Sequence, residues 1–176
     1  QHDGFQADAD ALRTFGETLT TRIDELTTQI YEQAGREFNI NSTKTLGTIL
    51  FDELGLPVIK KTKNGYSTNI DVLEALQGYH PIVGMVIEYR QLTKLRSTYV
   101  DGLLKVIADD GRIHSTFQQM VTATGRLSSV NPNLQNIPVR QELGSELRHM
   151  FAAKDGCVLV DADYSQIELR VLAHIA

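Results

Sequence analysis

Residues 8–34 read DADALRTFGETLTTRIDELTTQIYEQA, and this stretch decides the fold of the first part of the chain. Its apolar side chains recur at spacings of three or four residues, at Leu12, Phe15, Leu19, Ile23, Leu26 and Ile30. That period places them on one face of an α-helix. The stretch therefore predicts one long amphipathic helix, which ends at Gly35.

Further helical patterns follow this stretch. The polar run Asn41-Ser42-Thr43 offers N-cap side chains for a shorter helix. Asp71 is expected to cap a short helix, and Pro81 suits the first turn of another helix of about 26 residues. Between them, residues 58–68 are polar and lysine-rich, and the dipeptide Asn64-Gly65 predicts a mobile loop or a small hairpin.

At Asp109-Asp110-Gly111 the helical period gives way to short runs bounded by turn residues, which predicts a domain boundary between residues 1–110 and 111–176. The run Cys157-Val158-Leu159-Val160 is typical of a strand buried on both faces. Residues 122–138 are nearly all small, polar or Pro, so no core element is expected there. The other expected elements are strands over 112–118 and 150–153 and helices over 142–150 and 166–176. The predicted fold class is α+β.

The composition is that of an ordinary globular protein, with 176 residues, a formal charge of −5 and 41% hydrophobic residues. The single Cys157 excludes an internal disulfide, fits reducing surroundings and predicts a cytoplasmic location. No apolar run approaches the ~20 residues of a membrane span. The first residues lack an initiator Met and an export signal, so we expect an internal piece of a longer protein. The acidic total argues weakly against a nucleic-acid partner, but residues 38–107 carry eight basic and six acidic side chains.

Two carboxylates follow the predicted strand at 157–160. Period two would place Asp161 and Asp163 on one face of that strand, at its end. Mg²⁺ prefers one or two carboxylates and completes its shell with water and phosphate oxygens, so a metal site is one interpretation. The other is that Asp163 only caps the following helix. The spacing alone leaves both open.

Residues 124–138 form a second chemically distinctive segment. Arg126 offers a rigid fork of donors, and the Asn and Gln side chains offer paired donors and acceptors that suit groove edges of a duplex. A hydrogen-bonded surface loop is an equally ordinary use of the same residue types.

Taken together, four segments make the chain resemble the family A DNA polymerases of the bacterial DNA polymerase I type. They are TATGRLSSVNPNLQNIPVR at 122–140, DYSQIELRVLAH at 163–174, FNINS at 38–42 and LTKLRSTY at 92–99. The resemblance runs over essentially the whole chain. It implies a helical thumb up to about residue 110, followed by the first strands and the first helix of the polymerase palm.

The resemblance also implies roles for single residues. Asp163 is the catalytic residue that would bind two Mg²⁺ ions, with the Tyr164 carbonyl helping to hold one of them. Glu168 would lie beneath the incoming sugar and select deoxynucleotides. Asp161 has no role in the family pattern, and we expect it to be exposed to solvent or to contact the metal ligands from outside. The remaining nucleotide-binding residues are Ser165, Gln166 and Ile167. The residues that would hold primer-template DNA are Arg126, Asn133, Gln135, Asn136, Asn39, Asn41, Ser42, Thr43, Lys94, Ser97, Thr98 and Tyr99.

The resemblance further implies a parent protein that extends a primer with deoxynucleoside triphosphates and acts as a monomer in DNA replication and repair, at the bacterial nucleoid. The fingers helix and the second carboxylate motif of the family do not occur in this chain, so the isolated chain is expected to be inactive. For Arg170 and His174 we expect an internal salt bridge or a core contact, and for Ser42 and Thr43 helix capping is an equal alternative to phosphate contact. Two other classes remain open, an autonomous duplex-binding module without catalysis and a helical interaction protein. The exposed edges of the strand at 157–160 also predict self-association.

Overall fold

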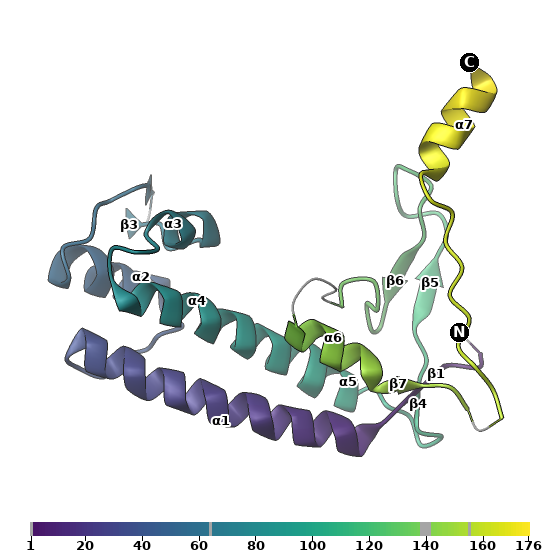
Figure 1. Ribbon diagram of the computed structural model, residues 1–176, viewed down its shortest axis with the longest axis horizontal. Helices are drawn as coiled ribbons and strands as arrows, with labels where there is room; N and C mark the ends of the chain where they lie inside the picture. Colours follow the sequence, from purple (N-terminus) through teal and green to yellow (C-terminus); the bar gives the residue numbers. More distant parts are fainter. Residues whose placement is uncertain (1, 64, 138–141, 155) are drawn as a thin grey trace.

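Two long helical segments lie antiparallel and form the base of the molecule (Figure 1). The computed structural model describes residues 2–63, 65–137, 142–154 and 156–176. The first segment is α1, Ala9–Ala34, and it confirms the predicted long helix. Asp8 caps it by accepting hydrogen bonds from the backbone N–H groups of Asp10 and Ala11, and Gly35 ends it with φ 71°. Such a left-handed backbone favours glycine. The buried residues of α1 are Leu12, Phe15, Gly16, Leu19, Leu26 and Ile30.

The second long segment runs without interruption through α4, Pro81–Lys94, the π-helical turn η2, Leu95–Val100, and α5, Asp101–Leu104. Pro81 occupies the first turn, as predicted, and His80 Nδ1 accepts from the backbone N–H of Ile82. The apolar spacing did not predict the π-helical turn, which forms one continuous helical rod with its neighbours. Its buried residues pack against α1 and complete the main core.

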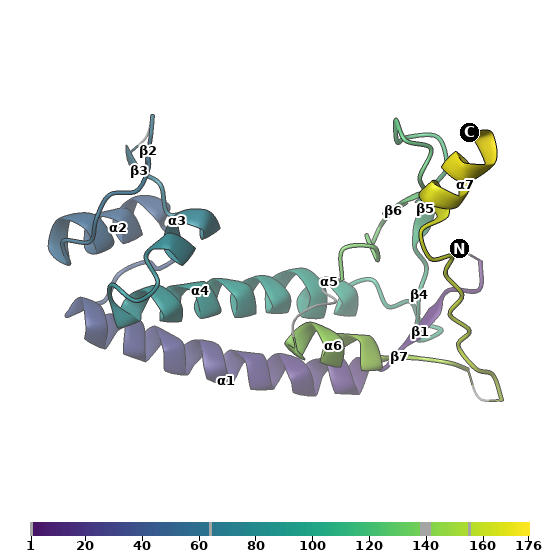
Figure 2. The ribbon, with the colours of Figure 1, turned by 45° about the horizontal axis from the view of Figure 1, so that its top comes forward.

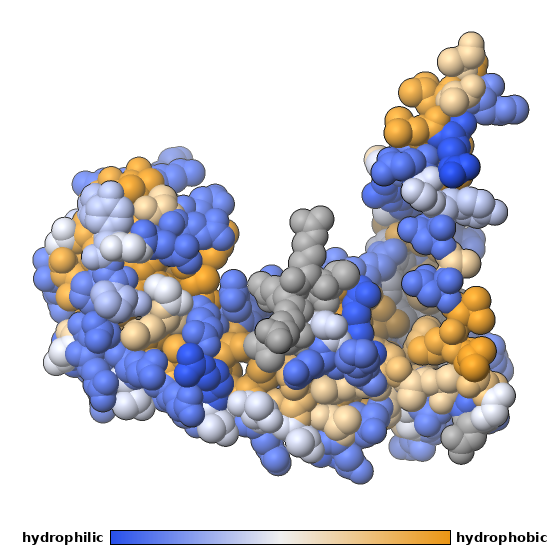
Figure 3. All heavy atoms as spheres, in the orientation of Figure 1, coloured by the Kyte–Doolittle hydropathy of each residue, from blue (hydrophilic) through white to orange (hydrophobic). Residues whose placement is uncertain are grey.

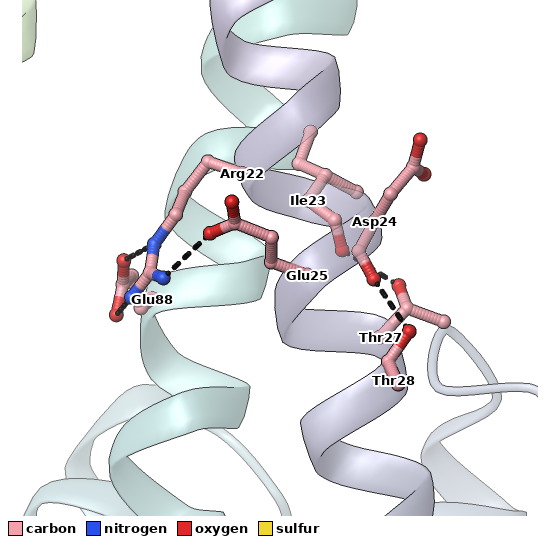
Figure 4. Close-up of polar contacts among 7 residues, drawn as sticks. All are labelled: Arg22, Ile23, Asp24, Glu25, Thr27, Thr28 and Glu88. Carbon is pink, nitrogen blue, oxygen red and sulfur yellow. Dashed lines mark hydrogen bonds and ion pairs between the residues drawn. The ribbon is translucent and has the colours of Figure 1, made fainter.

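An ion-pair network spans the α1–α4 contact at the solvent edge (Figure 4). Arg22 Nε donates to Glu88 Oε1 at 2.8 Å, and Arg22 Nη1 donates to Glu25 Oε2 at 3.0 Å. These hydrogen bonds raise the pKa of Arg22, and the bond to Glu88 has the larger effect. Because the three side chains are about half exposed, each pair contributes only about 0.2–1 kcal/mol. The apolar face therefore supplies most of the stability of this helix pair.

One end of the base carries α2, Thr43–Gly47, the π-helical turn η1, Thr48–Glu53, and α3, Ile70–Ala75. The predicted hairpin is present as β2, Lys61–Thr62, paired with β3, Gly65–Tyr66. Asn64, on which that prediction also rested, lies outside the described residues. The predicted cap at Asp71 is wrong, because Asn69 Oδ1 accepts from the backbone N–H of Val72 and Asp71 lies in the first turn.

The other end carries a three-stranded antiparallel sheet in the order β4-β1-β7. Its strands are β1, Phe5–Ala7, β4, Arg112–Ile113, and β7, Phe151–Ala152, and α6, Glu142–His149, precedes β7. Phe5 pairs with Ile113, and Gln6 pairs with Ala152. The strand at 150–153 and the helix at 142–150 were predicted, but β1 was not, because three residues carry too little pattern. The division of the chain near residue 110 stays a prediction.

A second hairpin extends beyond this sheet and corrects two predictions. It pairs β5, Thr116–Gln118, with β6, Ser128–Val130. The predicted strand over 112–118 is therefore interrupted at His114 and Ser115. The segment over 122–138 does contain a core residue, since Ser129 of β6 is fully buried. The first part of the predicted strand pairs with β1 and the last part with β6, so a change of partner interrupts it.

The predicted buried strand at 157–160 is wrong. Val158 and Val160 are 81% and 84% exposed, and no strand within the described residues pairs with this run. An apolar run becomes a strand only where a neighbour accepts its backbone hydrogen bonds. The chain instead runs extended into α7, Ile167–Ile175, which projects away from the rest of the molecule (Figures 1 and 2). Apolar side chains gather on the surface at this end (Figure 3).

These elements make a mostly helical chain with small sheets, which is the α+β class that was predicted. Both ends rise from the helical base on the same side, and the surface between them is concave (Figures 1 and 3). The segments that carry the predicted DNA-binding residues are distributed along this shape. They are the residues around the start of α2 at one end, the end of α4 with η2 in the base, and the β5–β6 hairpin with the loop after it at the other end.

Candidate functional site

Two separately predicted residues meet at the tip of the β5–β6 hairpin. Arg126 Nη2 donates to Glu168 Oε1 of α7 at 3.0 Å. The backbone at Arg126 is held by a closed turn, in which the Thr122 hydroxyl donates to the Arg126 carbonyl at 2.5 Å and Gly125 has φ 74°. Two hydrogen bonds lower the pKa of Glu168. The larger effect comes from its own backbone N–H and the smaller from Arg126. The side chains of Arg126 and Glu168 are 75% and 69% exposed, so the pair is open to solvent and to a competing partner.

The residues that lead into α7 line a single surface hollow of about 450 Å³, formed by Asp163, Tyr164, Ser165, Gln166, Ile167 and Glu168. The whole predicted nucleotide-binding run therefore surrounds one space. Gln166 has φ 54°, in the left-handed region that L side chains rarely adopt. Arg170 donates from Nε to the Ser165 carbonyl at 2.9 Å and from its backbone N–H to the Gln166 carbonyl at 3.1 Å, which fixes this turn.

The prediction of a salt bridge or a core contact for Arg170 and His174 is wrong. Both residues are exposed on α7, and Arg170 bonds to a backbone carbonyl instead. A helix that projects from the molecule offers these side chains no core to contact.

The oxygen donors at this hollow have the chemistry that Mg²⁺ prefers. Asp163 is exposed and offers a carboxylate, and Tyr164 offers a backbone carbonyl. Asp161 does not share this hollow, because it lines a different, more apolar one with Leu159 and Val160. The prediction that Asp161 and Asp163 lie on one face of a strand is therefore wrong. Within the described ranges, no three His, Cys, Asp or Glu side chains gather into a metal-binding group. Asp163 thus supplies one carboxylate to a site that needs further ligands.

The loop that follows β6 holds the predicted duplex-contacting amides. Gln135 is used within the loop, because its Oε1 accepts from the Ser129 backbone N–H at 3.2 Å and its Nε2 donates to the Leu127 carbonyl at 3.0 Å. Asn133 and Asn136 are exposed, although Asn133 Oδ1 also accepts from the Gln135 backbone N–H. All three amide side chains are exposed, but Gln135 uses both ends of its amide to close the loop. Pro138, Val139 and Arg140, which belong to the matched segment, lie outside the described residues.

The predicted residues at the start of α2 have local partners. Ser42 caps the helix, since its Oγ accepts from the Thr45 backbone N–H at 3.3 Å. Asn39 Oδ1 accepts from the Asn41 backbone N–H, and Asn41 Nδ2 donates to the Tyr89 hydroxyl of α4 at 3.3 Å. These bonds order the segment 39–42 against the helical base. The exposed residues of this group are Asn39, Asn41 and Thr43.

The predicted residues on the second helical segment divide into two kinds. Lys94, Ser97 and Thr98 are exposed and accessible to a ligand. Tyr99 is 8% exposed, and its hydroxyl donates to the backbone carbonyl of Asn136. The structure therefore brings together Tyr99 and Asn136, which the sequence placed in separate segments.

Sequence reasoning missed a pair of buried serines. Ser115 and Ser129 are 4% and 0% exposed, and their hydroxyl oxygens lie 2.7 Å apart. Ser115 carried a usable signal, because period two places it on the same face of the predicted strand over 112–118 as Ile113, which is buried. Ser129 carried none, because it lies in a run of loop-forming residues.

Of the helices in the described residues, none combines the length and the apolar character that spanning a lipid bilayer requires.

The chain thus combines a helical base, a small sheet and a hairpin that brings Arg126 to the hollow lined by Asp163 and Glu168. Residues 9–176 match the family described as DNA polymerase family A, and the chain belongs to that family.

Among its relatives, the chain is 56% identical over 175 residues to DNA polymerase I of Geobacillus stearothermophilus and 54% identical over 176 residues to DNA polymerase I of Bacillus subtilis (strain 168). Both alignments cover 98% of this chain and 20% of the relative, so the chain spans about a fifth of the length of these relatives. A solved structure, the POL domain of Pol1 from M. smegmatis in complex with DNA primer-template and dNTP, is 42% identical with a TM-score of 0.86. That match covers 98% of this chain and 31% of the solved one.

Proposed function

We propose that this chain is the thumb and the beginning of the palm of a DNA-templated DNA polymerase, which extends a primer with deoxynucleoside triphosphates in DNA replication and repair. The observation that carries the proposal is the pairing of Arg126 with Glu168 at the hollow that Asp163 also lines. This pairing brings Arg126, a donor suited to the duplex, next to residues 163–168, which are suited to the nucleotide. The solved POL domain of Pol1 from M. smegmatis, which is in complex with DNA primer-template and dNTP, supports the same assignment.

The duplex would be held along the concave side of the molecule. Lys94 supplies positive charge, and exposed hydroxyl and amide groups supply donors to phosphate oxygens. Arg126, Asn133 and Asn136 carry donors suited to the minor groove, where the A N3 and T O2 acceptors look alike for A·T and T·A pairs. Such donors test the shape of a base pair without distinguishing A·T from T·A. The other residues assigned to the backbone of the duplex are Asn39, Asn41, Thr43, Ser97 and Thr98.

The reaction site would be built on the turn before α7. Asp163 and the Tyr164 carbonyl would hold Mg²⁺, which when bound supplies charge neutralisation for the triphosphate and lowers the pKa of the primer hydroxyl. Glu168 would lie beneath the sugar of the incoming nucleotide, where crowding disfavours a 2′-hydroxyl. The left-handed Gln166 and the Arg170–Ser165 bond keep this turn in one conformation. Ser165, Gln166 and Ile167 would form the wall of the nucleotide pocket.

The chain alone is proposed not to polymerise. Among the described residues that line this hollow, Glu168 is already paired with Arg126, which leaves Asp163 as the carboxylate for a metal ion. Two-metal chemistry needs more ligands than this one side chain provides. Templated incorporation by the purified chain would contradict this part of the proposal.

A chimera tests the catalytic part. Residues 1–176 would replace the matching segment of the Geobacillus stearothermophilus relative, and primer extension would be measured. Asp163→Asn is expected to lower extension by about 100-fold or more while primer-template still binds, since loss of a metal ligand removes several kcal/mol of transition-state stabilisation. The matched control is Asp161→Asn, a neighbouring exposed carboxylate in another hollow, which should leave extension within about twofold. An active Asp163→Asn chimera would refute the assignment.

A further inference from the structure

Tyr99 belongs to a segment that the sequence assigned to the duplex, and its hydroxyl donates to the backbone carbonyl of Asn136. We propose that Tyr99 is a positioning residue, whose hydroxyl holds the end of the loop 131–136 in the place from which Asn136 meets the duplex. The inference rests on the proposed function, because it concerns how that function's duplex contacts are held.

The burial of Tyr99 separates it from its neighbours on η2. Ser97 and Thr98 are exposed, whereas Tyr99 is 8% exposed and belongs to the main core. Its hydroxyl donates to the backbone carbonyl of Asn136, 37 residues further along the chain. A phenol that is buried in this way is not available to a phosphate, but it can fix the backbone that it contacts. Tyr99 thus connects the helical base to the end of the loop.

The beginning of the loop is fixed by the buried serine pair. Ser115 Oγ lies 2.7 Å from the Ser129 hydroxyl and 2.7 Å from the Pro132 carbonyl oxygen. Ser129 Oγ accepts from the Leu134 backbone N–H at 3.2 Å. One arrangement satisfies every group, with Ser129 donating to Ser115 and Ser115 donating to Pro132. The serines and Tyr99 therefore hold the loop from opposite ends.

The side chains between these anchors fall into two sets. Leu134 and Ile137 pack against the core, and Gln135 closes the loop back onto β6. Asn133 and Asn136 are exposed. Because the Tyr99 bond ends on the carbonyl of Asn136 itself, removing the hydroxyl frees the residue that carries one of the two contacts.

Tyr99→Phe tests this without creating a cavity, because the ring is kept. Primer-template affinity of this chain would be measured by fluorescence anisotropy for Tyr99→Phe, Asn136→Ala and the double variant. Tyr99→Phe is expected to weaken binding by about three- to tenfold, and to add less than about twofold once Asn136 is already Ala. If Tyr99 instead touched DNA, the two single effects would multiply, and the proposal would be overturned. The control is Tyr66→Phe, which loses a hydroxyl bond to Asp52 at the opposite end of the helical base and should bind within about twofold of wild type.

Hydrogen exchange without DNA separates this inference from the proposed function. In Tyr99→Phe the backbone amides of residues 133–137 should exchange several-fold faster, while those of β5 keep their rates. Unchanged exchange in the loop overturns the positioning role whatever the affinity data show. Failure of the wild-type chain to bind primer-template overturns the duplex part of both proposals, and faster loop exchange would then support only the contact between Tyr99 and the loop.

Discussion

Replacing Glu168 by glutamine should tighten the binding of primer-template to this chain. In the free chain Arg126 is occupied by Glu168 at 3.0 Å, so duplex binding has to break that ion pair before the arginine can enter a groove. A glutamine at this position would keep the size of the side chain and remove the charge. Arg126 would then be free to bind, and one negative charge beside the duplex would be gone.

The size of the effect follows from the exposure of the pair. Side chains that are 75% and 69% exposed form a surface ion pair, which water and salt screen strongly. Breaking such a pair accounts for a gain in affinity of about two- to fivefold at about 0.1 M salt. A larger gain would mean that Glu168 repels the duplex directly.

Fluorescence anisotropy with a labelled primer-template measures this gain, and two comparisons isolate its cause. Asp161→Asn removes a charge from the same segment without freeing an arginine, so it should change the affinity less than Glu168→Gln does. In an Arg126→Ala background, Glu168→Gln should lose most of its effect. An equal gain in both backgrounds would refute the competition between Glu168 and the duplex.

Two further predictions concern stability. Ile30 is fully buried in α1, so Ile30→Ala should lower the free energy of unfolding by about 2–5 kcal/mol in urea denaturation, whereas the exposed Thr28→Ala should stay within about 0.5 kcal/mol. A loss below about 1 kcal/mol at Ile30 would contradict its place in the core. Arg36 hydrogen-bonds Glu53 at 2.6 Å and lowers the pKa of that carboxyl below its ordinary 4.5. The stability from this pair is therefore present above the ordinary pKa and is lost as the pH falls through the lower folded-state pKa. Between about pH 5 and pH 3 the melting temperature of the wild type should fall more than that of Glu53→Gln, and parallel curves would disprove the linkage.

The helices of this protein were predictable because their information is local. The period of Leu12 to Ile30 predicts α1, and Gly35 ends it where the sequence indicated. The segment from Pro81 was likewise expected. Its π-helical turn was not, because apolar spacings of three and four residues describe an α-helix and a π-helical turn almost equally well.

The strands were predicted less well because their partners are distant in the chain. β1 forms only where Ile113 and Phe151 lie on either side of it, which no window around Phe5 reveals. The opposite case is the run from Val158 to Val160. This run has the composition of a buried strand, but no strand among the described residues pairs with it. The self-association that we expect of this exposed run stays a prediction.

The candidate site was predictable as a set of residues but not as an arrangement. The resemblance selected Arg126 and Glu168 separately, and only the structure places them 3.0 Å apart across 42 residues of chain. The resemblance also grouped Tyr99 and Gln135 with duplex contacts, whereas their polar atoms bond to the chain itself. A side chain's partner depends on the fold around it, which a motif does not contain.

The measurement that tests the central claim most directly is the salt dependence of primer-template binding by this chain, with Arg126→Ala beside the wild type. We predict that affinity falls steeply as salt rises, because phosphate contacts release counterions, and that Arg126→Ala binds about tenfold more weakly. The matched control is Arg13→Ala, which removes an exposed arginine paired with Asp10 on α1 and should bind like the wild type. Binding that ignores salt, or an Arg126→Ala chain that binds as well as the wild type, would contradict the account.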